Sequence, residues 1–494
     1  MGVVVAIDAG TTGVRAVAVD ESGRPSGWAY REFPQHFPRP GWVEHDPLEI
    51  WDATVAVLAE LRAAVDEPVA AIGITNQRET AVVWDRTSSK PLAPAIVWQD
   101  RRTAARCEEL TADGHLDLVR SRTGLVLDPY FTATKLEWLF GTGGVTPDAN
   151  TAVGTVDSWI IWQLSGGATH ATDPSNASRT LLYDIGALAW SSELCDLFGV
   201  PRHCLAELAP SSGRVATTAD TTALGAGIPV AGIAGDQQAA LFGQACVEPG
   251  MTKNTYGTGS FVLMNVGAEC PEPVEGLLTT VAWTLDRPDG AHTAYALEGS
   301  IFVTGAAIQW LRDGLGIISE ASEVGPLAES VDDTGGVYLV PAFAGLGSPW
   351  WDARARGTIV GITRGTGRAE LARATVEAMA YQTRDVVDAM TAAAGHDIAE
   401  LRVDGGASVM DLLLQVQADQ LGVSVARPHN RETTAMGAAF LAGLAEGVWG
   451  SLDEVGEAWS LDHRFDPATD RSGADRAYEE WKRAVERAGD WADD

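Results

Sequence analysis

Short apolar runs and longer amphipathic runs alternate along the whole chain. The apolar runs at residues 3–7 and 15–20 have the length of buried strands, whereas the segment that begins at Asp46 places its apolar residues on one helical face. This helix has a complete start signal, with Asp46 as N-cap, Pro47 at the first helical position and Glu49 three residues after the cap. Strands that alternate with helices favour an α/β fold.

The same alternation continues to the end of the chain. Strands are predicted at 69–75, 93–99, 228–236, 336–343 and 401–408, and a hairpin at 252–267. Helices are predicted directly after Asp236 and at 369–390, 433–447 and 474–491. Because no stretch has the composition of a disordered linker, we expect ordered α/β units throughout.

The opening of the chain and residues 252–267 share one layout, namely a strand, a turn rich in glycine and threonine, and a second strand. We interpret this repeat as an internal duplication. The turn sequence VEPG at residues 247–250 lies between the two copies. The sequence therefore predicts two domains, residues 1–246 and residues 247–494, each large enough to bury its own core.

Three predicted strand ends carry clusters of glycine, threonine and aspartate. The clusters are Asp8 with Thr11 and Thr12, then Thr255, Gly257, Thr258 and Gly259, and finally Asp404, Gly405 and Gly406. The first cluster can be an ordinary surface hairpin, or its N–H groups and hydroxyls can hold a polyphosphate while Asp8 holds a metal ion. Strand ends of an α/β sheet face the ligand crevice, so the three clusters can meet at one nucleotide.

The chain is strongly acidic, because 67 Asp and Glu against 35 Lys and Arg give a formal net charge of −32. Such a field repels nucleic acids and anionic membranes, and an anionic substrate such as ATP would need local cationic or dipolar contacts. No segment reaches the ~18 apolar residues that a membrane span requires. We therefore expect neither a nucleic-acid partner nor membrane insertion.

Cysteine usage favours a reducing compartment. The five cysteines are an odd number without a C-x-x-C spacing, so they suggest neither a zinc site nor a disulfide framework. The N-terminal segment also lacks the basic leader and long apolar core of a signal peptide. These features predict a cytoplasmic protein.

Five polar or aromatic residues are candidates for a small-substrate pocket. Asp236 can take a proton from an attacking hydroxyl, or equally well cap the helix that follows it. Arg78 and Glu79 can present a donor and an acceptor to a polyol, or form a surface ion pair. Trp98 and Tyr130 can supply aromatic walls, although core packing is the commoner role of a single aromatic residue. The chain has no G-K-[ST] loop, no G-x-G-x-x-G turn and no H-E-x-x-H pair that would indicate other chemistry.

Ten long and specific motifs are spread from Val3 to Trp449, among them DAGTTGVRA, GITNQRET, IVWQDRR, GIAGDQQAALFGQ, KNTYGTGSF and RVDGGAS. Together they resemble the FGGY carbohydrate-kinase family. The resemblance implies an α/β fold with two actin-like, ribonuclease-H-like domains that flank a cleft for nucleotide and substrate. It also implies the ATP-dependent phosphorylation of glycerol to sn-glycerol 3-phosphate, the first step of glycerol catabolism, with ATP and Mg²⁺ as cofactors.

The resemblance also implies roles for individual residues. Glycerol contacts are implied for Arg78, Glu79, Trp98, Tyr130, Asp236, Gln237 and Phe261. Nucleotide contacts are implied for Thr11, Thr12, Gly13, Arg15, Thr258, Gly305, Gln309 and Gly406. Asp236 would be the general base for the 3-hydroxyl, Asp8 would hold Mg²⁺ through water, and Arg15 would be a local cation for the phosphates.

Two alternative functions stay open, and two positions depart from the family. A related kinase for another polyol or sugar, or a non-catalytic actin-like ATP switch, would keep the phosphate hairpins. Met410 stands where relatives often have an asparagine near the adenine, and Gly227 stands where an arginine would bind fructose bisphosphate. Assembly into a homodimer or a homotetramer is compatible with the resemblance.

Overall fold

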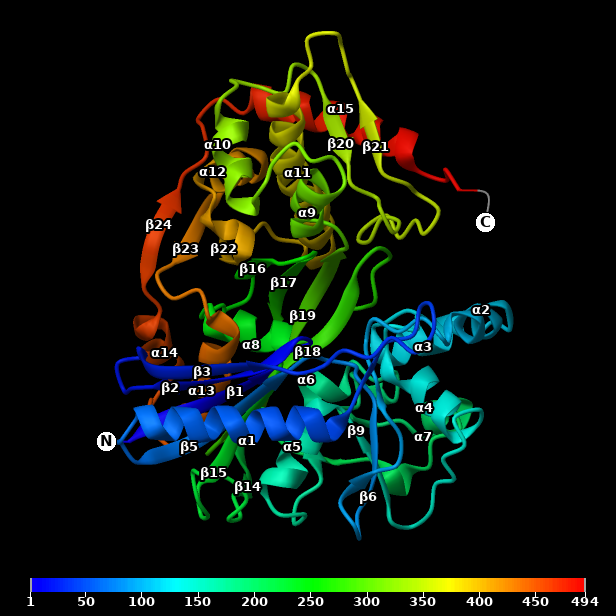
Figure 1. Cartoon of the computed structure of the whole chain (residues 1–494), viewed down its shortest axis with the longest axis vertical. Helices are drawn as coiled ribbons and strands as arrows, with labels where there is room; N and C mark the ends of the chain where they lie inside the picture. Colours follow the sequence, from blue (N-terminus) through cyan, green and yellow to red (C-terminus); the bar gives the residue numbers. More distant parts are fainter. Residues whose placement is uncertain (1, 493–494) are drawn as a thin grey trace.

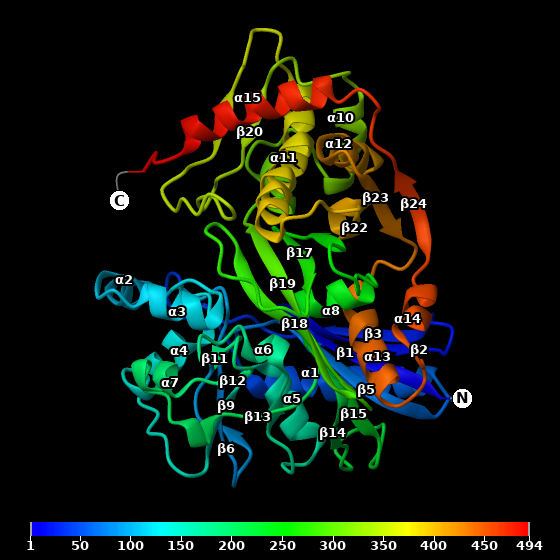
Figure 2. The same ribbon diagram turned by 180° about the vertical axis from the view of Figure 1, so that it is seen from behind.

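The computed structural model describes residues 2–492 and has two lobes (Figure 1). The lower lobe in Figure 1 contains most of the first half of the chain, and the upper lobe contains most of the second half. Two late helices, α13 (Thr433–Ala445) and α14 (Leu452–Ala458), return to the strands of the lower lobe, as both views show (Figure 2). The two halves of the sequence are therefore interlocked rather than simply joined end to end.

The main sheet has 13 strands in the order β24-β23-β22-β16-β17-β19-β18-β14-β15-β5-β1-β2-β3. The strands are β1 (Val3–Ala9), β2 (Gly13–Val19), β3 (Pro25–Glu32), β5 (Val69–Asn76), β14 (Ser212–Thr217), β15 (Pro229–Gly235), β16 (Thr252–Tyr256), β17 (Ser260–Gly267), β18 (Leu278–Arg287), β19 (Gly290–Ile301), β22 (Glu400–Gly405), β23 (Ser424–Pro428) and β24 (Leu461–Phe465). Shorter strands pair in small sheets beside it, among them β4 (Glu44–His45) with β8 (Ala95–Ile96) and β6 (Val82–Asp85) with β9 (Thr151–Gly154).

Five strands of each half repeat one pairing pattern. In the first half, β1 pairs antiparallel with β2 and β2 antiparallel with β3, whereas β1 with β5 and β5 with β15 are parallel. In the second half, β16 pairs antiparallel with β17 and β17 antiparallel with β19, whereas β16 with β22 and β22 with β23 are parallel. The two glycine-rich hairpins, β1–β2 and β16–β17, therefore occupy equivalent places in the two halves.

The first strand is buried on both faces, which explains its continuous apolar run. Val3, Val5 and Ile7 belong to the core under α1 (Pro47–Ala64) and α5 (Val156–Leu164). Val4 and Ala6 belong to the core under α13 on the opposite face. By this alternation Asp8 lies on the face that carries α13.

Small residues let α8 (Asp236–Gly243) and α13 cross at close range between the halves. A Cβ atom on Gly437 would overlap the carbonyl oxygen of Ala239, and one on Gly243 would overlap the carbonyl oxygen of Thr433. Backbone thus touches backbone at this crossing. The crossing holds the N-terminus of α8, and with it Asp236, at the junction of the two halves.

The core of the upper lobe forms around α11 (Arg368–Ala394), which packs against α10 (Val324–Glu329), α12 (Asp411–Leu421) and strands β17 and β19. The remaining helices are α2 (Ala104–Ala112), α3 (Leu116–Thr123), α4 (Thr132–Phe140), α6 (Pro174–Ala177), α7 (Ser192–Leu197), α9 (Gly305–Asp313) and α15 (Ser472–Ala488). Within residues 2–492, none of the helices combines the length and the apolarity that a bilayer crossing requires.

Most predicted elements are present, but several details of the prediction are wrong. The strand predicted at 401–408 ends at Gly405, and residues 406–409 form a 3-10 turn instead. Asp46 caps α1 by accepting from Leu48 N at 2.8 Å, yet Glu49 bonds to His36 instead of completing a capping box. The strand predicted at 93–99 is only Ala95–Ile96, because the chain then turns to present Trp98. The strand predicted at 336–343 is likewise only β20 (Tyr338–Val340).

Candidate active site

The turn between β1 and β2 is fixed by side chains from three other segments. Trp98 Nε1 donates to Thr11 Oγ1 at 2.9 Å, and Gln35 Nε2 donates to Thr11 O at 2.8 Å. Gln77 Nε2 donates to Gly10 O at 3.0 Å. The hairpin predicted to bind phosphate is therefore held against the segment that carries Trp98.

Tyr30 lies beside the rest of this hairpin. Its Oη is 3.5 Å from Thr12 Oγ1, and a Cβ on Gly13 would come within 2.8 Å of its ring. The guanidinium of Arg15 packs over the same ring at 5.5 Å and forms an ion pair with Glu432. One cationic side chain is thus placed next to the hairpin of an otherwise acidic protein.

Asp8 pairs with Arg15 across the hairpin and is near the carboxylate of Asp236. Burial and the neighbouring charge of Asp236 raise the pKa of Asp8 to about 7, whereas Arg15 opposes this shift. Two neighbouring carboxylates favour a cation between or beside them.

Arg78 and Glu79 follow the end of β5, and both are buried, with 2% and 1% of their surface exposed. The alternative of a surface ion pair is therefore wrong. Glu79 has φ = 61°, a left-handed conformation that costs energy for a residue with a side chain. Its carbonyl oxygen accepts from Thr132 Oγ1 at 3.0 Å and from Lys135 Nζ at 3.2 Å, which holds the unusual backbone in place.

Asp236 is the first residue of α8, and Gly235 occupies the N-cap position. Helix capping is therefore not the role of Asp236. Its Oδ1 lies 3.2 Å from Arg78 Nε and accepts from Gln237 N at 2.8 Å. Burial raises the pKa of Asp236, while Arg78 and Lys253 act against this shift. The side chain still has 31% of its surface exposed, so the carboxylate is accessible.

Two aromatic rings, Tyr130 and Phe261, contact Arg78, and Trp98 packs against Tyr130. Trp98 and Tyr130 meet edge to face with centroids 5.6 Å apart, and Tyr130 Oη accepts from Arg78 Nη2 at 3.2 Å. The ring of Phe261, from β17 of the second half, lies 5.8 Å from the guanidinium. The structure therefore brings together the aromatic and polar residues predicted to contact glycerol. Apolar walls with few polar groups are typical of small-ligand pockets.

Lys253, on β16, reaches the same cluster from the second half. Its Nζ donates to Gln237 Oε1 at 2.5 Å and to Thr255 Oγ1 at 2.9 Å. Burial lowers the pKa of this lysine to about 8, and the charges of Asp404 and Asp236 oppose the shift. The amide of Gln237 is thus fixed by a buried cation.

Sequence reasoning missed three buried charged residues of this cluster, namely Lys253, Arg179 and Glu298. Arg179 Nε donates to Glu79 Oε1 at 2.7 Å, and Arg179 Nη2 donates to Glu298 Oε1 at 2.9 Å. One signal could have found Glu298, since it is a lone carboxylate within the apolar strand sequence ALEGSIFV. Lys253 is one of only four lysines in the chain and lies within the predicted hairpin.

The second hairpin contacts the N-terminus of α9. Gly305 N donates to Gly257 O at 3.0 Å, and Ala306 N donates to Thr258 O at 3.0 Å. A Cβ on Gly305 would lie 2.6 Å from Gly257 O, so this approach requires glycine. Thr258 and Gly305, both predicted to contact the nucleotide, are therefore adjacent.

The other two predicted nucleotide contacts lie at the edges of this region. Gly406 follows β22 directly, and Gly405 is paired with Tyr256 at the end of β16. Gln309 lies one turn into α9 and is exposed. In the described chain no hydrogen bond joins Gly406 or Gln309 to either hairpin.

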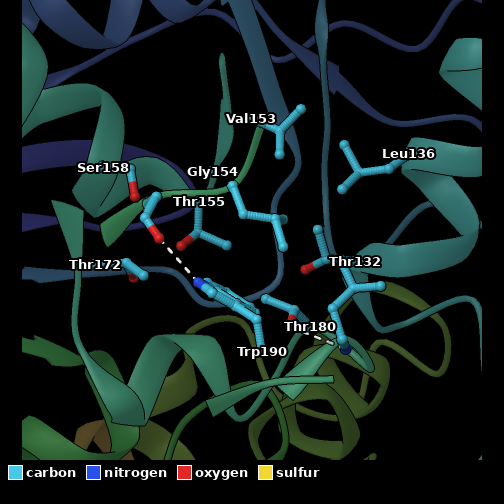
Figure 3. Close-up of a pocket in the computed structure, with 12 residues that line it drawn as sticks. Thr132, Leu136, Val153, Gly154, Thr155, Ser158, Thr172, Thr180 and Trp190 are labelled. Carbon is cyan, nitrogen blue, oxygen red and sulfur yellow. Dashed lines mark hydrogen bonds between the residues drawn. The ribbon is translucent and has the colours of Figure 1, made fainter. Parts of the chain in front are cut away.

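Two cavities lie outside the cluster. A cavity of about 20 Å³, lined among others by Thr132, Ser158 and Trp190, is far too small for a substrate (Figure 3). A hollow of about 500 Å³ lies between residues 22–25 and residues 457–460. Neither cavity is lined by a predicted glycerol or nucleotide contact.

Two family models match the chain. The N-terminal domain of the FGGY family of carbohydrate kinases matches residues 3–243, and the C-terminal domain of the same family matches residues 252–446. The two matches leave only a short segment between them, and each contains one of the glycine-rich hairpins.

Full-length relatives and a solved structure agree with these matches. The glycerol kinase of Bordetella parapertussis is 53% identical over 99% of this chain and 97% of that protein. The glycerol kinase of Carboxydothermus hydrogenoformans is 54% identical over 99% of this chain and 98% of that protein. The crystal structure of Plasmodium falciparum glycerol kinase with ADP superposes with a TM-score of 0.93 at 34% identity, covering 99% of this chain and 98% of the other. The fold is therefore the expected α/β fold of two actin-like, ribonuclease-H-like domains, and the chain belongs to the FGGY family of carbohydrate kinases.

Proposed function

We propose that this protein transfers the γ-phosphate of ATP to the 3-hydroxyl of glycerol and produces sn-glycerol 3-phosphate. Full-length relatives above 50% identity that are named glycerol kinase support this reaction. The observation that carries the proposal is the position of Asp236, an accessible carboxylate 3.2 Å from Arg78 and beside the Trp98–Tyr130 wall. A kinase needs such a base near the attacking hydroxyl and apolar walls for the carbon chain.

In the proposed mechanism, Arg78 and Glu79 bind the hydroxyls of glycerol that do not react. Trp98 and Phe261 contact its carbon atoms, and Asp236 accepts the proton of the reacting hydroxyl. Burial raises the pKa of Asp236, which makes it a better proton acceptor than an ordinary aspartate, while the charge of Arg78 opposes this shift and favours the ionised form.

The nucleotide is proposed to lie between the two hairpins. Thr11, Thr12 and Gly13 would contact its phosphates from the first half, and Thr258 with Gly305 from the second. Arg15 would neutralise phosphate charge, which requires that the guanidinium leave Glu432. Closure of the two halves would exclude water and align the γ-phosphate with the glycerol hydroxyl for in-line transfer.

The residues present fit a magnesium ion. Residues 2–492 contain no group of three or more His, Cys, Asp or Glu side chains that could hold a metal alone, and Mg²⁺ is usually held by one or two carboxylates together with substrate phosphates. Asp8 is the proposed ligand, acting through water, and its pKa is raised first by burial and then by the negative charge of Asp236. A bound Mg²⁺ would neutralise charge on the phosphates.

The finer features of the proposal concern domains, compartment and assembly. We divide the chain into residues 1–246 and 247–494, with one hairpin in each. Four of the five cysteines are buried and all are free, which supports a reducing, cytoplasmic compartment. A homodimer or homotetramer stays a prediction, which light scattering on the purified protein would test.

A coupled assay of ADP formation tests the proposed function. We expect kcat/KM for glycerol to exceed the values for xylulose and gluconate by several orders of magnitude, since the pocket residues match a three-carbon substrate. Comparable values for the three compounds would instead indicate a broader polyol or sugar kinase. ATP hydrolysis without any dependence on glycerol would favour the actin-like ATP switch.

A further inference from the structure

Four charged side chains form a buried cluster behind the proposed glycerol pocket. They are Arg78, Glu79, Arg179 and Glu298, and none has more than 2% of its surface exposed. Arg78 and Glu79 are proposed to touch glycerol, whereas no role has been given so far to Arg179 or Glu298. Buried charges at such a place require partners on every side, because an unpaired one is strongly destabilising.

Glu298 holds both arginines at once. Its Oε2 accepts from Arg78 Nη1 at 2.5 Å, and its Oε1 accepts from Arg78 Nη2 at 3.2 Å and from Arg179 Nη2 at 2.9 Å. Burial alone would raise the pKa of Glu298, but Arg179 and Arg78 lower it to about 2. The carboxylate is therefore ionised at all pH values at which the enzyme would work.

Arg179 also contacts Glu79 and Tyr130, which are proposed to bind glycerol. Its Nε donates to Glu79 Oε1 at 2.7 Å, and its guanidinium lies 5.7 Å from the ring centre of Tyr130. Arg179 thus fixes the carboxylate of Glu79, just as Glu298 fixes the guanidinium of Arg78. The Arg78–Glu298 pair has two contact points, and such charge-assisted pairs restrict orientation as well as distance.

The cluster also joins the two halves of the protein. Arg78 and Arg179 belong to the first half, whereas Glu298 lies on β19, where it pairs with Leu263 of β17 and Leu278 of β18. The orientation of Arg78 is therefore determined by a carboxylate from the opposite half.

Glycerol can enter the pocket in two orientations, and contacts at fixed positions can select one of them. Its two terminal hydroxymethyl groups are chemically identical and differ only in their spatial relation to the central carbon. A pocket can distinguish them only if several polar groups hold fixed positions relative to the base, since a displaced group would accept the reversed molecule nearly as well.

We propose that Glu298 and Arg179 are positioning residues that determine which terminal hydroxyl of glycerol faces Asp236. Glu298 fixes Arg78, Arg179 fixes Glu79, and the two ligands then admit only the orientation that yields sn-glycerol 3-phosphate. This inference rests on the proposed glycerol phosphorylation.

The test compares the wild-type enzyme with two variants. Glu298→Gln keeps the side-chain size and removes the charge, whereas Arg179→Lys keeps the charge and removes the guanidinium that contacts Glu79 and Glu298 together. Total ADP measures all phosphorylation, and a dehydrogenase specific for sn-glycerol 3-phosphate measures one enantiomer. We expect the two amounts to agree for the wild type. For the variants we expect a clear fraction of sn-glycerol 1-phosphate, about tenfold higher KM for glycerol and an unchanged KM for ATP.

Asp385→Asn is the matched control. Asp385 is also a buried carboxylate of the second half, but it bonds to Tyr478, Trp481 and Trp350 rather than to this cluster. We expect its product to remain a single enantiomer even if its stability falls. Loss of stability alone therefore cannot produce the expected result.

The outcomes separate the two proposals. If the wild type does not phosphorylate glycerol, the proposed function fails. If the wild type is active but both variants, folded by circular dichroism, form sn-glycerol 3-phosphate alone, the positioning proposal is wrong while the function stands. Arg179→Lys keeps the positive charge, so it decides the question if Glu298→Gln does not fold.

Discussion

Trp98 Nε1 donates a hydrogen bond of 2.9 Å to Thr11 Oγ1, and this bond joins the proposed glycerol pocket to the first glycine-rich hairpin. The same indole meets Tyr130 edge to face, so the aromatic wall and the hairpin form one unit. A displacement of either side would be transmitted to the other. Binding of glycerol and binding of the phosphates should therefore be coupled.

Trp98→Phe tests this coupling, because it keeps an aromatic ring and removes the donor. Loss of a hydrogen bond of about 1 kcal/mol is expected to raise the KM values of both glycerol and ATP about fivefold. The matched variant Tyr130→Phe removes a bond to Arg78 alone, so only the KM for glycerol should rise. Initial rates measured over a grid of glycerol and ATP concentrations give the KM for glycerol and the KM for ATP of each variant. A Trp98→Phe enzyme with an unaltered KM for ATP would contradict the coupling.

Because α8 and α13 cross at close range, one added methyl group at the crossing should strongly lower the free energy of unfolding. Gly437→Ala would place Cβ against the carbonyl oxygen of Ala239, and relief requires the two helices to separate. We expect a loss of about 3 kcal/mol in the free energy of unfolding. The control is Gly456→Ala in α14, where no atom lies within 4 Å of the added carbon, and this variant should be as stable as the wild type or up to about 1 kcal/mol more stable. Equal unfolding curves for the two variants would show that the close crossing is absent.

The buried carboxyl of Asp385 predicts a pH-dependent contribution to stability. Burial raises its pKa from 3.8 to about 6, although Tyr478, Trp481 and Trp350 donate hydrogen bonds to it. The folded state therefore binds more protons than the unfolded state between these values. The stabilisation is fully present below pH 3.8 and is lost as the pH rises through about 6.

Urea unfolding of the wild type and Asp385→Asn at several pH values measures this effect. Relative to the variant, the wild type should lose roughly 2 kcal/mol of unfolding free energy as the pH rises from 4 to 7. A difference that does not change with pH would mean that Asp385 has an ordinary pKa in the folded protein.

Local patterns in the sequence were sufficient to predict the positions of most strands and helices. The apolar run of β1, the amphipathic face of α1 and the two glycine-rich hairpins each have a local signal that the structure preserves. The short strand at Ala95–Ile96 is an exception, since its apolar sequence continues into a turn that tertiary contacts determine. Periodicity alone cannot distinguish these cases.

The buried charges behind the pocket could not be predicted in this way. Glu298 and Arg78 are 220 positions apart, and their contact depends on how the two halves pack together. Arg179 follows a helix of four residues and has no motif that distinguishes it from a surface arginine. The predicted contacts of Gly406 and Gln309 with the nucleotide likewise stay predictions, because only a bound nucleotide can test them.

The pH dependence of the reaction follows from the environment of Asp236. The base must be ionised to accept a proton, and burial raises its pKa above the ordinary 3.8. We therefore expect kcat/KM for glycerol, at saturating ATP and magnesium, to fall on the acid side at a pH above 4. The measurement is a pH profile on enzyme that remains folded throughout, and a rate that stays constant down to pH 4 would contradict a base with a raised pKa.

The turnover number of Asp236→Asn with glycerol tests the central claim most directly. Asparagine keeps the size of the side chain and its position at the start of α8, but it cannot accept the proton of the reacting hydroxyl. We predict that kcat falls by about 10²- to 10⁴-fold, the range typical of a general base, while the unfolding curve changes little. A folded Asp236→Asn enzyme that phosphorylates glycerol as fast as the wild type would contradict the account.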